Sequence, residues 1–377
     1  MPAPLSNLLE SHAIPTHVIR KWPYYWPLLA LLTLGLTWGL HGLGGFVTLA
    51  VTVVLAGAVM AAVEHAEVVA HRVGEPYGSL ILAVAVTVIE VGMIVMLMLS
   101  AAPGVETLAR DTVFAATMVT TNAIVGMAIF VSAKSGGLAY FNREGAGTAL
   151  SAVLVVATAT LALPSVTTSA TEGRFTTSQL IFIGFIALLV WVFFVLTQTR
   201  GHRDFFLPIT KKGEILKVSS HANPPSRRRT LVSLLLLAMS LVAVVGLSKV
   251  LSYPLENAVE LFGLPEAMVG LLIALVVLMP ETISAFKNAR SGRTQIALNL
   301  GYGSALASIG LTVPIVGMIA IFADLPIVLG LEATHLVLLA LTGGLSILTL
   351  APGRAVRFQG AMHMVLAAAY IFLVAVP

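Results

Sequence analysis

Long apolar runs alternate with short polar segments along almost the whole chain. Most runs approach the roughly 20 apolar residues that an α-helix needs to cross a bilayer. They are continuous and do not alternate residue by residue, which argues against a transmembrane β-barrel. The pattern predicts an all-α polytopic membrane protein with about 11 transmembrane helices, at residues 25–41, 44–66, 77–100, 111–133, 145–164, 178–199, 230–251, 266–287, 294–322, 327–350 and 357–376.

The composition agrees with this class. Hydrophobic residues make up 58% of the chain and charged residues only 10%, whereas a soluble domain carries roughly 25% charged residues. The chain has no cysteine, which excludes disulfides, thiolate metal sites and a cysteine nucleophile. The pI near 9.4 does not predict a nucleic-acid partner, because the basic residues lie in loops between apolar runs. The predicted surroundings are the lipid bilayer.

The distribution of Lys and Arg predicts the orientation. If the N-terminus is cytoplasmic, 18 of the 21 basic residues fall in cytoplasmic segments, and only Arg110, Arg174 and Lys249 lie outside. Cytoplasmic loops of membrane proteins carry such an excess. We therefore expect a cytoplasmic N-terminus, an external C-terminus and an odd number of spans. The polar start of the chain, 1–21, lacks a signal-peptide pattern and is expected to be a retained tail.

A long basic loop divides the chain into two similar halves. The predicted organisation is a tail and first helix at 1–43, a five-helix repeat at 44–200, a cytoplasmic linker at 201–229 and a second five-helix repeat at 230–377. Five helices are an odd number, so the two repeats would have opposite orientations, as in many secondary transporters. The segments LILAVAVTVIE, ending at Glu90, and LLIALVVLMPE, ending at Glu281, align without gaps.

Glu90 and Glu281 are the most informative residues, because both lie well inside predicted spans. An ionised carboxylate in hydrocarbon costs several kcal/mol unless it is paired, hydrated or neutralised, so such residues usually serve ion or proton paths. The alternative is a protonated side chain that is hydrogen-bonded to a neighbouring helix. Pro280 should bend its helix beside Glu281 and free backbone carbonyls there.

Polar side chains recur around both glutamates. Thr87 and Ser284 lie on the same helix faces as the two acids, and the following span of each repeat is rich in hydroxyls and amides. The amides of Asn122 and Asn299 need partners in lipid, whereas single hydroxyls are more often packing residues. The candidate cation ligands are Glu90, Glu281, Asn122 and Ser304, supported by Thr87, Thr120, Thr121, Ser284, Asn299 and Ser308.

An all-oxygen site with two carboxylates suits a hard cation such as Ca²⁺, and protons compete for the same carboxylates. The sequence therefore predicts a secondary transporter that exchanges Ca²⁺ for H⁺ by alternating access. A Na⁺ or K⁺/H⁺ antiporter and a cation channel remain alternatives. No cofactor is expected. The sequence contains no HExxH motif and no GxSxG motif at a span end, so neither motif suggests an enzyme.

Two clusters lie near the predicted membrane surfaces. Glu64, His65, Glu67 and His71 end the second predicted span and would form a cytoplasmic mouth that gathers cations or senses pH. Glu332 and His335 would serve an outer vestibule. Solvated helix ends are the alternative for both clusters.

Several segments resemble the ChaA-type calcium/sodium:proton antiporters of the calcium/cation antiporter superfamily. They are GEPYGSLIL at 74–82, the sequence around Glu90, Pro280-Glu281, GSALAS at 303–308 and LTVP at 311–314. The likeness extends over nearly the whole chain from about residue 20.

The resemblance implies one extra helix plus two inverted five-helix repeats, in a bacterial plasma membrane. The family's essential glutamates would fall on Glu90 and Glu281, with Thr121, Asn122 and Ser304 as supporting ligands. Calcium/proton exchangers typically carry Gly-Asn-Ala-x-Glu in both repeats, whereas Thr87 and Leu278 stand three residues before the glutamates here. This departure keeps Na⁺ and K⁺ open as substrates.

Overall fold

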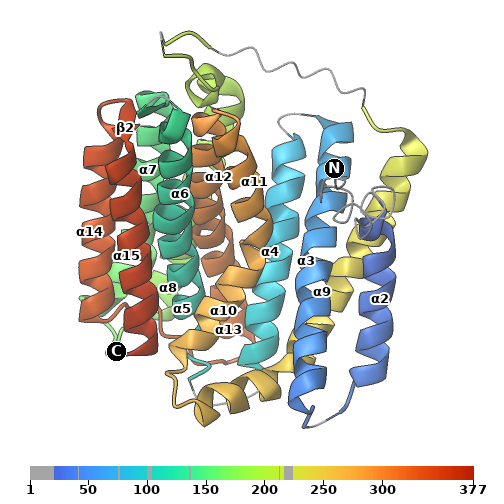
Figure 1. The fold of residues 1–377 in the computed structure, drawn as a ribbon. Coiled ribbons are helices and arrows are strands. Elements are labelled where there is room, and N and C mark those ends of the chain that lie inside the picture. The colour runs from blue at the N-terminus through green and yellow to red at the C-terminus, as the bar shows by residue number, and fades with distance from the viewer. Residues whose placement is uncertain are drawn as a thin grey trace, which may run out of the picture.

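A computed structural model describes residues 21–40, 42–74, 77–99, 104–135, 137–211, 213–215 and 224–377. They form a bundle of helices, which confirms the predicted class of all-α membrane protein (Figure 1). The helices are α2 (Trp22–Thr37), α3 (Gly45–Val73), α4 (Tyr77–Met98), α5 (Leu108–Met118), α6 (Val125–Ser132), α7 (Arg143–Ala157), α8 (Thr177–Leu196), α9 (Arg227–Leu261), α10 (Ala267–Val277), α11 (Met279–Arg290), α12 (Thr294–Ala307), α13 (Val313–Phe322), α14 (Ala333–Leu350) and α15 (Arg357–Ala375).

Within the described residues, nine helical segments are long and apolar enough to span a bilayer, and α10 and α11 together form a tenth, bent one. The first predicted span corresponds to α2, whose 16 residues fall short of the roughly 20 that a span requires. An eleventh span therefore stays a prediction. The predicted span at 327–350 begins too early, because the helix starts at Ala333, whereas α9 is longer than predicted, with 35 residues. The polar start of the chain, 1–20, lies outside the described residues.

Four π-helical segments occur among the described residues. Two of them, η5 (Thr158–Ala162) and η7 (Thr197–Gly201), follow α7 and α8, and the other two lie inside long helices and widen them. η3 (Val119–Ile124) joins α5 to α6, and η9 (Ser308–Thr312) joins α12 to α13. These are the third helices of the two predicted repeats. Such widened turns in α-helices frequently occur at functional sites. Here they occupy equivalent places in the two halves, which the apolar pattern alone does not reveal.

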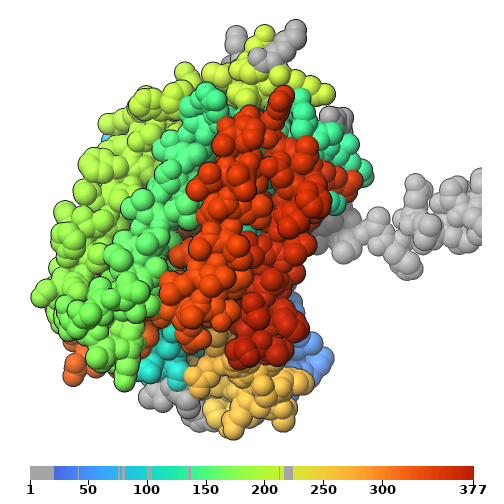
Figure 2. All heavy atoms as spheres, turned by 90° about the vertical axis from the view of Figure 1, so that its left-hand side faces the viewer, coloured from blue at the N-terminus to red at the C-terminus, as the bar shows by residue number. Residues whose placement is uncertain are grey.

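The helix contacts are reciprocal between the halves. The second helix of each half packs on the third helix of the other: α4 contacts η9 and α13, and α10 contacts α5. The fifth helices behave likewise, since α8 contacts α13 and η9 whereas α15 contacts α6 and η3. Helix α2 lies outside this exchange and packs on α3 and α9, on the right of Figure 1. Figure 2 shows the side of the bundle away from α2, where α14 lies between α7 and α15.

Loop contacts divide the connections between two ends of the bundle. At one end, strand β1 (Leu138–Tyr140) pairs with β2 (Arg354–Val356), so the α6–α7 and α14–α15 connections meet. At the other end, the amides of Val328 and Gly330 donate to the carbonyls of Glu106 and Gly173, respectively. The loops thus alternate as the basic residues predict. Which end is cytoplasmic stays a prediction.

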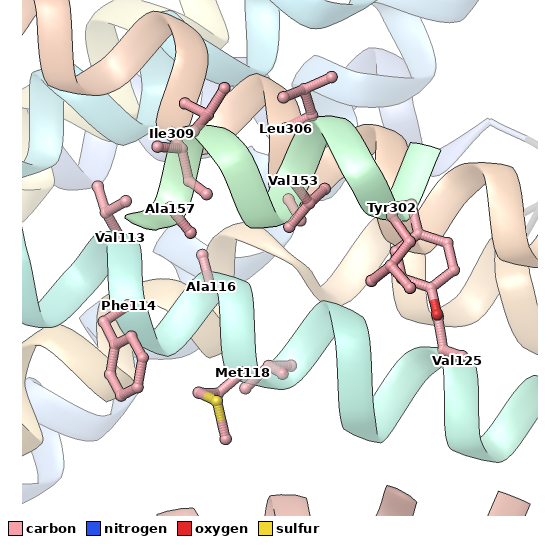
Figure 3. Close-up of a cluster of buried hydrophobic side chains, with 14 of the residues drawn as sticks. Val113, Phe114, Ala116, Met118, Val125, Val153, Ala157, Tyr302, Leu306 and Ile309 are labelled. Carbon is pink, nitrogen blue, oxygen red and sulfur yellow. The ribbon is translucent and has the colours of Figure 1, made fainter. Parts of the chain in front are cut away.

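The third helices are embedded in the core. Val113, Phe114 and Met118 of α5 lie in one buried cluster with Tyr302 and Leu306 of α12 (Figure 3). All five side chains are at most 1% exposed. This packing fixes η3 and η9 between the surrounding helices and leaves the polar side chains of both segments inside the protein.

Helices α6 and α15 cross at two glycines, which gives a test of the packing. A Cβ atom at Gly360 would lie 2.6 Å from the backbone nitrogen of Phe130 and 2.7 Å from the carbonyl oxygen of Gly126. We expect Gly360→Val to destabilise the protein by about 3 kcal/mol, because neither backbone can move aside cheaply. Thermal unfolding in detergent measures this. Gly344→Val on α14 is the control, because a Cβ there meets nothing within 4 Å. Equal melting temperatures for the two variants would contradict this packing.

Candidate cation site

Glu90 of α4 lies between the two halves of the protein and is 4% exposed. Its carboxylate accepts hydrogen bonds from the hydroxyls of Ser308, at 2.5 Å, and Thr312, at 3.0 Å. Both hydroxyls belong to η9, where they are four residues apart and face the same way. A glutamate of the first half is therefore held by the third helix of the second half.

Glu281 enters from the other half, just after a break in the helix. Helices α10 and α11 meet at an angle of 52° at this break, and Pro280 is the second residue of α11, as predicted from the sequence. The Oε2 atom of Glu281 is buried and has no hydrogen-bond partner among the described residues. Leaving such an acceptor unsatisfied costs about 1–3 kcal/mol, and more when it is charged. A proton on this carboxylate, or a cation bound to it, would supply the missing partner.

The two glutamates belong to one electrostatic site. Glu281 interacts electrostatically with Glu90 and with Glu67 of α3. Glu90 is enclosed, whereas Glu281 is half-buried and Glu67 is exposed. Glu67 in turn interacts with Glu64, Lys287 and His71. Acidic side chains thus extend from the buried site toward the end of the bundle where α3 and α11 terminate.

The other predicted ligands take different places. Thr87 is buried one turn before Glu90, whereas Ser284 and Ser304 are half-buried. The hydroxyls of Thr120 and Thr121 donate to carbonyls of their own helix, at Ala116 and Thr117. Among the predicted hydroxyls, Ser308 is the one with a hydrogen bond to a site carboxylate. Thr312, which is not among the predicted ligands, makes the second such bond.

The two amides are bonded outside this carboxylate pair. Asn122 donates to Thr342 of α14, at 3.0 Å, and its oxygen lies 3.1 Å from Nδ1 of His363 on α15. Asn299 donates to the carbonyl of Phe206 in the linker, at 2.7 Å. The structure thus does not bring either amide to Glu90 in this conformation. His363 is fully buried. Sequence reasoning did not assign it a role, although a histidine inside an apolar span was an available signal.

The predicted mouth is only partly assembled as expected. Glu64, Glu67 and His71 are exposed at one end of α3. His65 differs, because it is 2% exposed and its ring contacts the hydroxyl of Ser233, at 3.3 Å, and the carbonyl of Pro23, at 2.9 Å. Its ring links α3 to α9 and to the start of α2. The i, i+1 spacing from Glu64 places His65 on a different helix face, and only the packing shows which face is inside.

The opposite end carries a pocket of about 350 Å³ that contains the predicted vestibule residues Glu332 and His335. An ion pair lines it as well, with Nε of Arg110 2.7 Å from Asp111. A further nitrogen of Arg110 lies 3.7 Å from Glu332. Sequence reasoning missed Asp111, although an acid beside one of only three basic residues expected outside was an available signal.

Known proteins that are similar to this chain are ion transporters. The family model described as "Sodium/calcium exchanger protein" matches residues 41–200 and 232–376. A Sinorhizobium fredii protein with the provisional name ionic transporter y4hA is 41% identical over 86% of this chain and 87% of its own length. The sodium-potassium/proton antiporter ChaA of Escherichia coli is 33% identical over 83% of this chain and 84% of its own.

Solved structures share the fold. Native YfkE matches with a TM-score of 0.69 at 18% identity, over 94% of this chain and 99% of YfkE. The H⁺/Ca²⁺ exchanger CAX matches with a TM-score of 0.65 at 15% identity, over 93% of this chain and 91% of CAX. At such identities the likeness shows the architecture, and the substrate has to be argued from the site.

Proposed function

This chain belongs to the sodium/calcium exchanger protein family, and on that premise we propose that it exchanges Ca²⁺ for H⁺ at Glu90 and Glu281. The family and the relatives are ion transporters, not enzymes, and the chain is a multi-pass membrane antiporter of the calcium/cation type. The proposed location is a bacterial inner membrane. The single observation that carries the proposal is the pair of electrostatically interacting glutamates, one from each half, of which Glu90 is held by hydroxyls of η9 and Glu281 has a buried oxygen without a partner among the described residues.

Charge balance supports a divalent cation. Two carboxylates neutralise one Ca²⁺, and two protons neutralise the same carboxylates. Each loaded form is then free of net charge, whereas the empty pair would carry two negative charges through a low-dielectric interior at a cost of several kcal/mol. The empty site would consequently be disfavoured during the switch between the two sides. This difference couples the release of one ion to the binding of the other.

Access in this conformation would run from one end of the bundle. Glu281 is half-buried, and Glu67 lies between it and the end that carries Lys287. The distribution of basic residues predicts that this end is cytoplasmic. Glu67 would attract the cation and pass it to Glu281, and Glu90 would complete its coordination with Ser308 and Thr312. Oxygen ligands of this kind are the ones that Ca²⁺ prefers.

A monovalent cation is the second candidate, and two observations favour it. A relative that is 33% identical is named a sodium-potassium/proton antiporter. In addition, the amides of Asn122 and Asn299 are bonded elsewhere, which leaves four carboxylate oxygens and the hydroxyls of Ser308 and Thr312, at the lower end of the six to eight oxygens that Ca²⁺ usually takes. The architecture and both glutamates would serve this exchange equally.

Proton movement in inside-out vesicles distinguishes the candidates. A pH gradient, acid inside, is formed, and Ca²⁺, Na⁺ or K⁺ is then added separately. Loss of the gradient with Ca²⁺ at micromolar to low-millimolar concentrations supports Ca²⁺/H⁺ exchange. Loss with only Na⁺ or K⁺ supports the monovalent alternative. A cation current without proton movement would indicate a channel, and no response from correctly inserted protein would refute antiport.

Ser308 gives a quantitative prediction. Removal of its hydroxyl in Ser308→Ala takes away one of two donors to Glu90. A hydrogen bond to a charged group contributes about 1.5–3 kcal/mol, so we expect the half-maximal Ca²⁺ concentration to rise about tenfold or more. The control is Thr160→Val, whose buried hydroxyl donates to the Val156 carbonyl of its own helix. Similar Ca²⁺ dependence in both variants would remove Ser308 from the site.

A further inference from the structure

A continuous groove runs along the outside of the bundle where α2, α4 and α9 meet. Its wider and more open part has a volume of about 670 Å³ and includes Gly35, Val88 and Leu241. Its second part, about 430 Å³, includes Lys249 and Tyr253. Trp38 and Met96 line both parts, so the two form one groove, named the α2–α9 groove below.

The dimensions of the groove match one leaflet of a bilayer. Along α9 it extends from Leu241 to Tyr253, which is 12 residues or about 18 Å at 1.5 Å per residue. Half of a hydrocarbon core of about 30 Å is roughly 15 Å. The wider part is lined by apolar side chains and glycines. An acyl chain that entered at the Lys249 end would therefore reach the middle of the membrane.

The charged end of the groove carries a cation without an acidic partner. Lys249 is exposed, and its ammonium lies 5.3 Å from the ring centroid of Trp38. No ion pair between described residues includes Lys249. The other two basic residues expected at this end, Arg110 and Arg174, are paired with Asp111 and Glu106. Among the basic residues that the structure describes at this end, Lys249 is thus the one without an acidic partner, and its ammonium is exposed to an external anion.

Two aromatic residues indicate where the Lys249 end of the groove lies relative to the membrane surface. Trp38 directly follows α2 and is 57% exposed, and Tyr253 is 58% exposed. Trp and Tyr concentrate where hydrocarbon meets headgroups, and Lys side chains reach toward the same layer. An apolar groove as long as a leaflet, with an unpaired ammonium at this depth, has the chemistry of a phospholipid with an anionic headgroup.

We propose that the α2–α9 groove binds one anionic phospholipid, with an acyl chain against Gly35 and Leu241 and the headgroup phosphate at Lys249. The site would give α2, which lies outside the reciprocal helix pairs, a specific contact with the bilayer. It is separate from Glu90 and Glu281 and does not depend on which cation is transported.

Native mass spectrometry of the purified full chain in detergent tests the proposal, with phosphatidylglycerol or phosphatidylcholine added at equal concentration. The wild type should retain one phosphatidylglycerol in preference to phosphatidylcholine. Lys249→Gln should lower the affinity for phosphatidylglycerol about fivefold, the contribution of one Lys near an anionic surface, and Lys249→Arg should keep it.

A second variant tests the groove while Lys249 stays in place. A Cβ at Gly35 meets nothing within 4 Å, so Gly35→Leu fills the groove without a clash and should expel the lipid. Gly344→Leu on α14 is the matched control, because its surroundings are equally open. Three results would overturn the proposal: unchanged phosphatidylglycerol binding in Lys249→Gln or in Gly35→Leu, equal binding of both lipids by the wild type, or a dimer that Gly35→Leu dissociates.

Discussion

Glu90→Gln is expected to lower proton-coupled cation exchange by at least about 100-fold, because an amide can neither give up a proton nor neutralise a cation. The figure corresponds to the roughly 3 kcal/mol that is lost when one member of a buried charged pair is removed. Folding should survive. The hydroxyls of Ser308 and Thr312 can rotate to accept from the amide, and the two side chains have nearly the same volume. The vesicle assay measures exchange, and size-exclusion chromatography in detergent measures folding.

Glu144→Gln is the control for this variant. Glu144 pairs with Arg143 at 2.7 Å, but both side chains are exposed, and such surface pairs contribute about 0–1 kcal/mol. Its exchange activity should stay near that of the wild type. Residual exchange in Glu90→Gln above a few per cent of wild type would place the ion path elsewhere in the bundle.

Glu281→Gln is expected to abolish exchange as well, with a smaller disturbance of the structure. The buried Oε2 atom has no partner among the described residues, so no intramolecular hydrogen bond at that atom is lost. The variant removes the charge that repels Glu90 in the empty site. We therefore expect equal or higher thermal stability without cation, together with loss of the stabilisation that added Ca²⁺ gives the wild type. Ligand-dependent stabilisation follows the ratio of free ligand to Kd.

The neighbouring Thr282→Val serves as its control. The Thr282 hydroxyl donates to the Leu278 carbonyl four residues earlier, across the helix break, at 2.7 Å. This bond is local and does not involve either site carboxylate. The substitution should keep exchange and stabilisation by Ca²⁺. If Glu281→Gln were still stabilised by Ca²⁺ as the wild type is, Glu281 would not be a cation ligand.

Sequence patterns predicted the helical class and the loop alternation because both depend on local, additive quantities. A run of apolar residues is sufficient to favour a span, and each loop contributes its own basic residues. The bend at Pro280 was likewise local, since proline lacks the donor that a continuous helix needs. Glu90 and Glu281 could be singled out because an acid in an apolar run is costly wherever its helix packs.

The partners of those acids required the tertiary structure. Ser308 was one of several hydroxyls in its span, and nothing in its spacing distinguished it from Ser304. The widened turn of η9 directs Ser308 and Thr312 to Glu90, and a π-helical segment leaves no mark in hydrophobic periodicity. Asn122 is a stronger candidate than these hydroxyls in sequence, because an amide in lipid needs partners, yet the packing of α14 and α15 directs its amide to Thr342 and His363.

By itself, the sequence determined what each helix requires: burial in lipid for its apolar residues, and a polar surrounding for Glu90 and Glu281. Only the tertiary structure decided which of many polar groups supply that surrounding. The contacts form between residues more than 200 positions apart, such as Glu90 and Ser308. Their pairing depends on how two inverted halves exchange neighbours, and this is a collective result of packing that no single segment encodes.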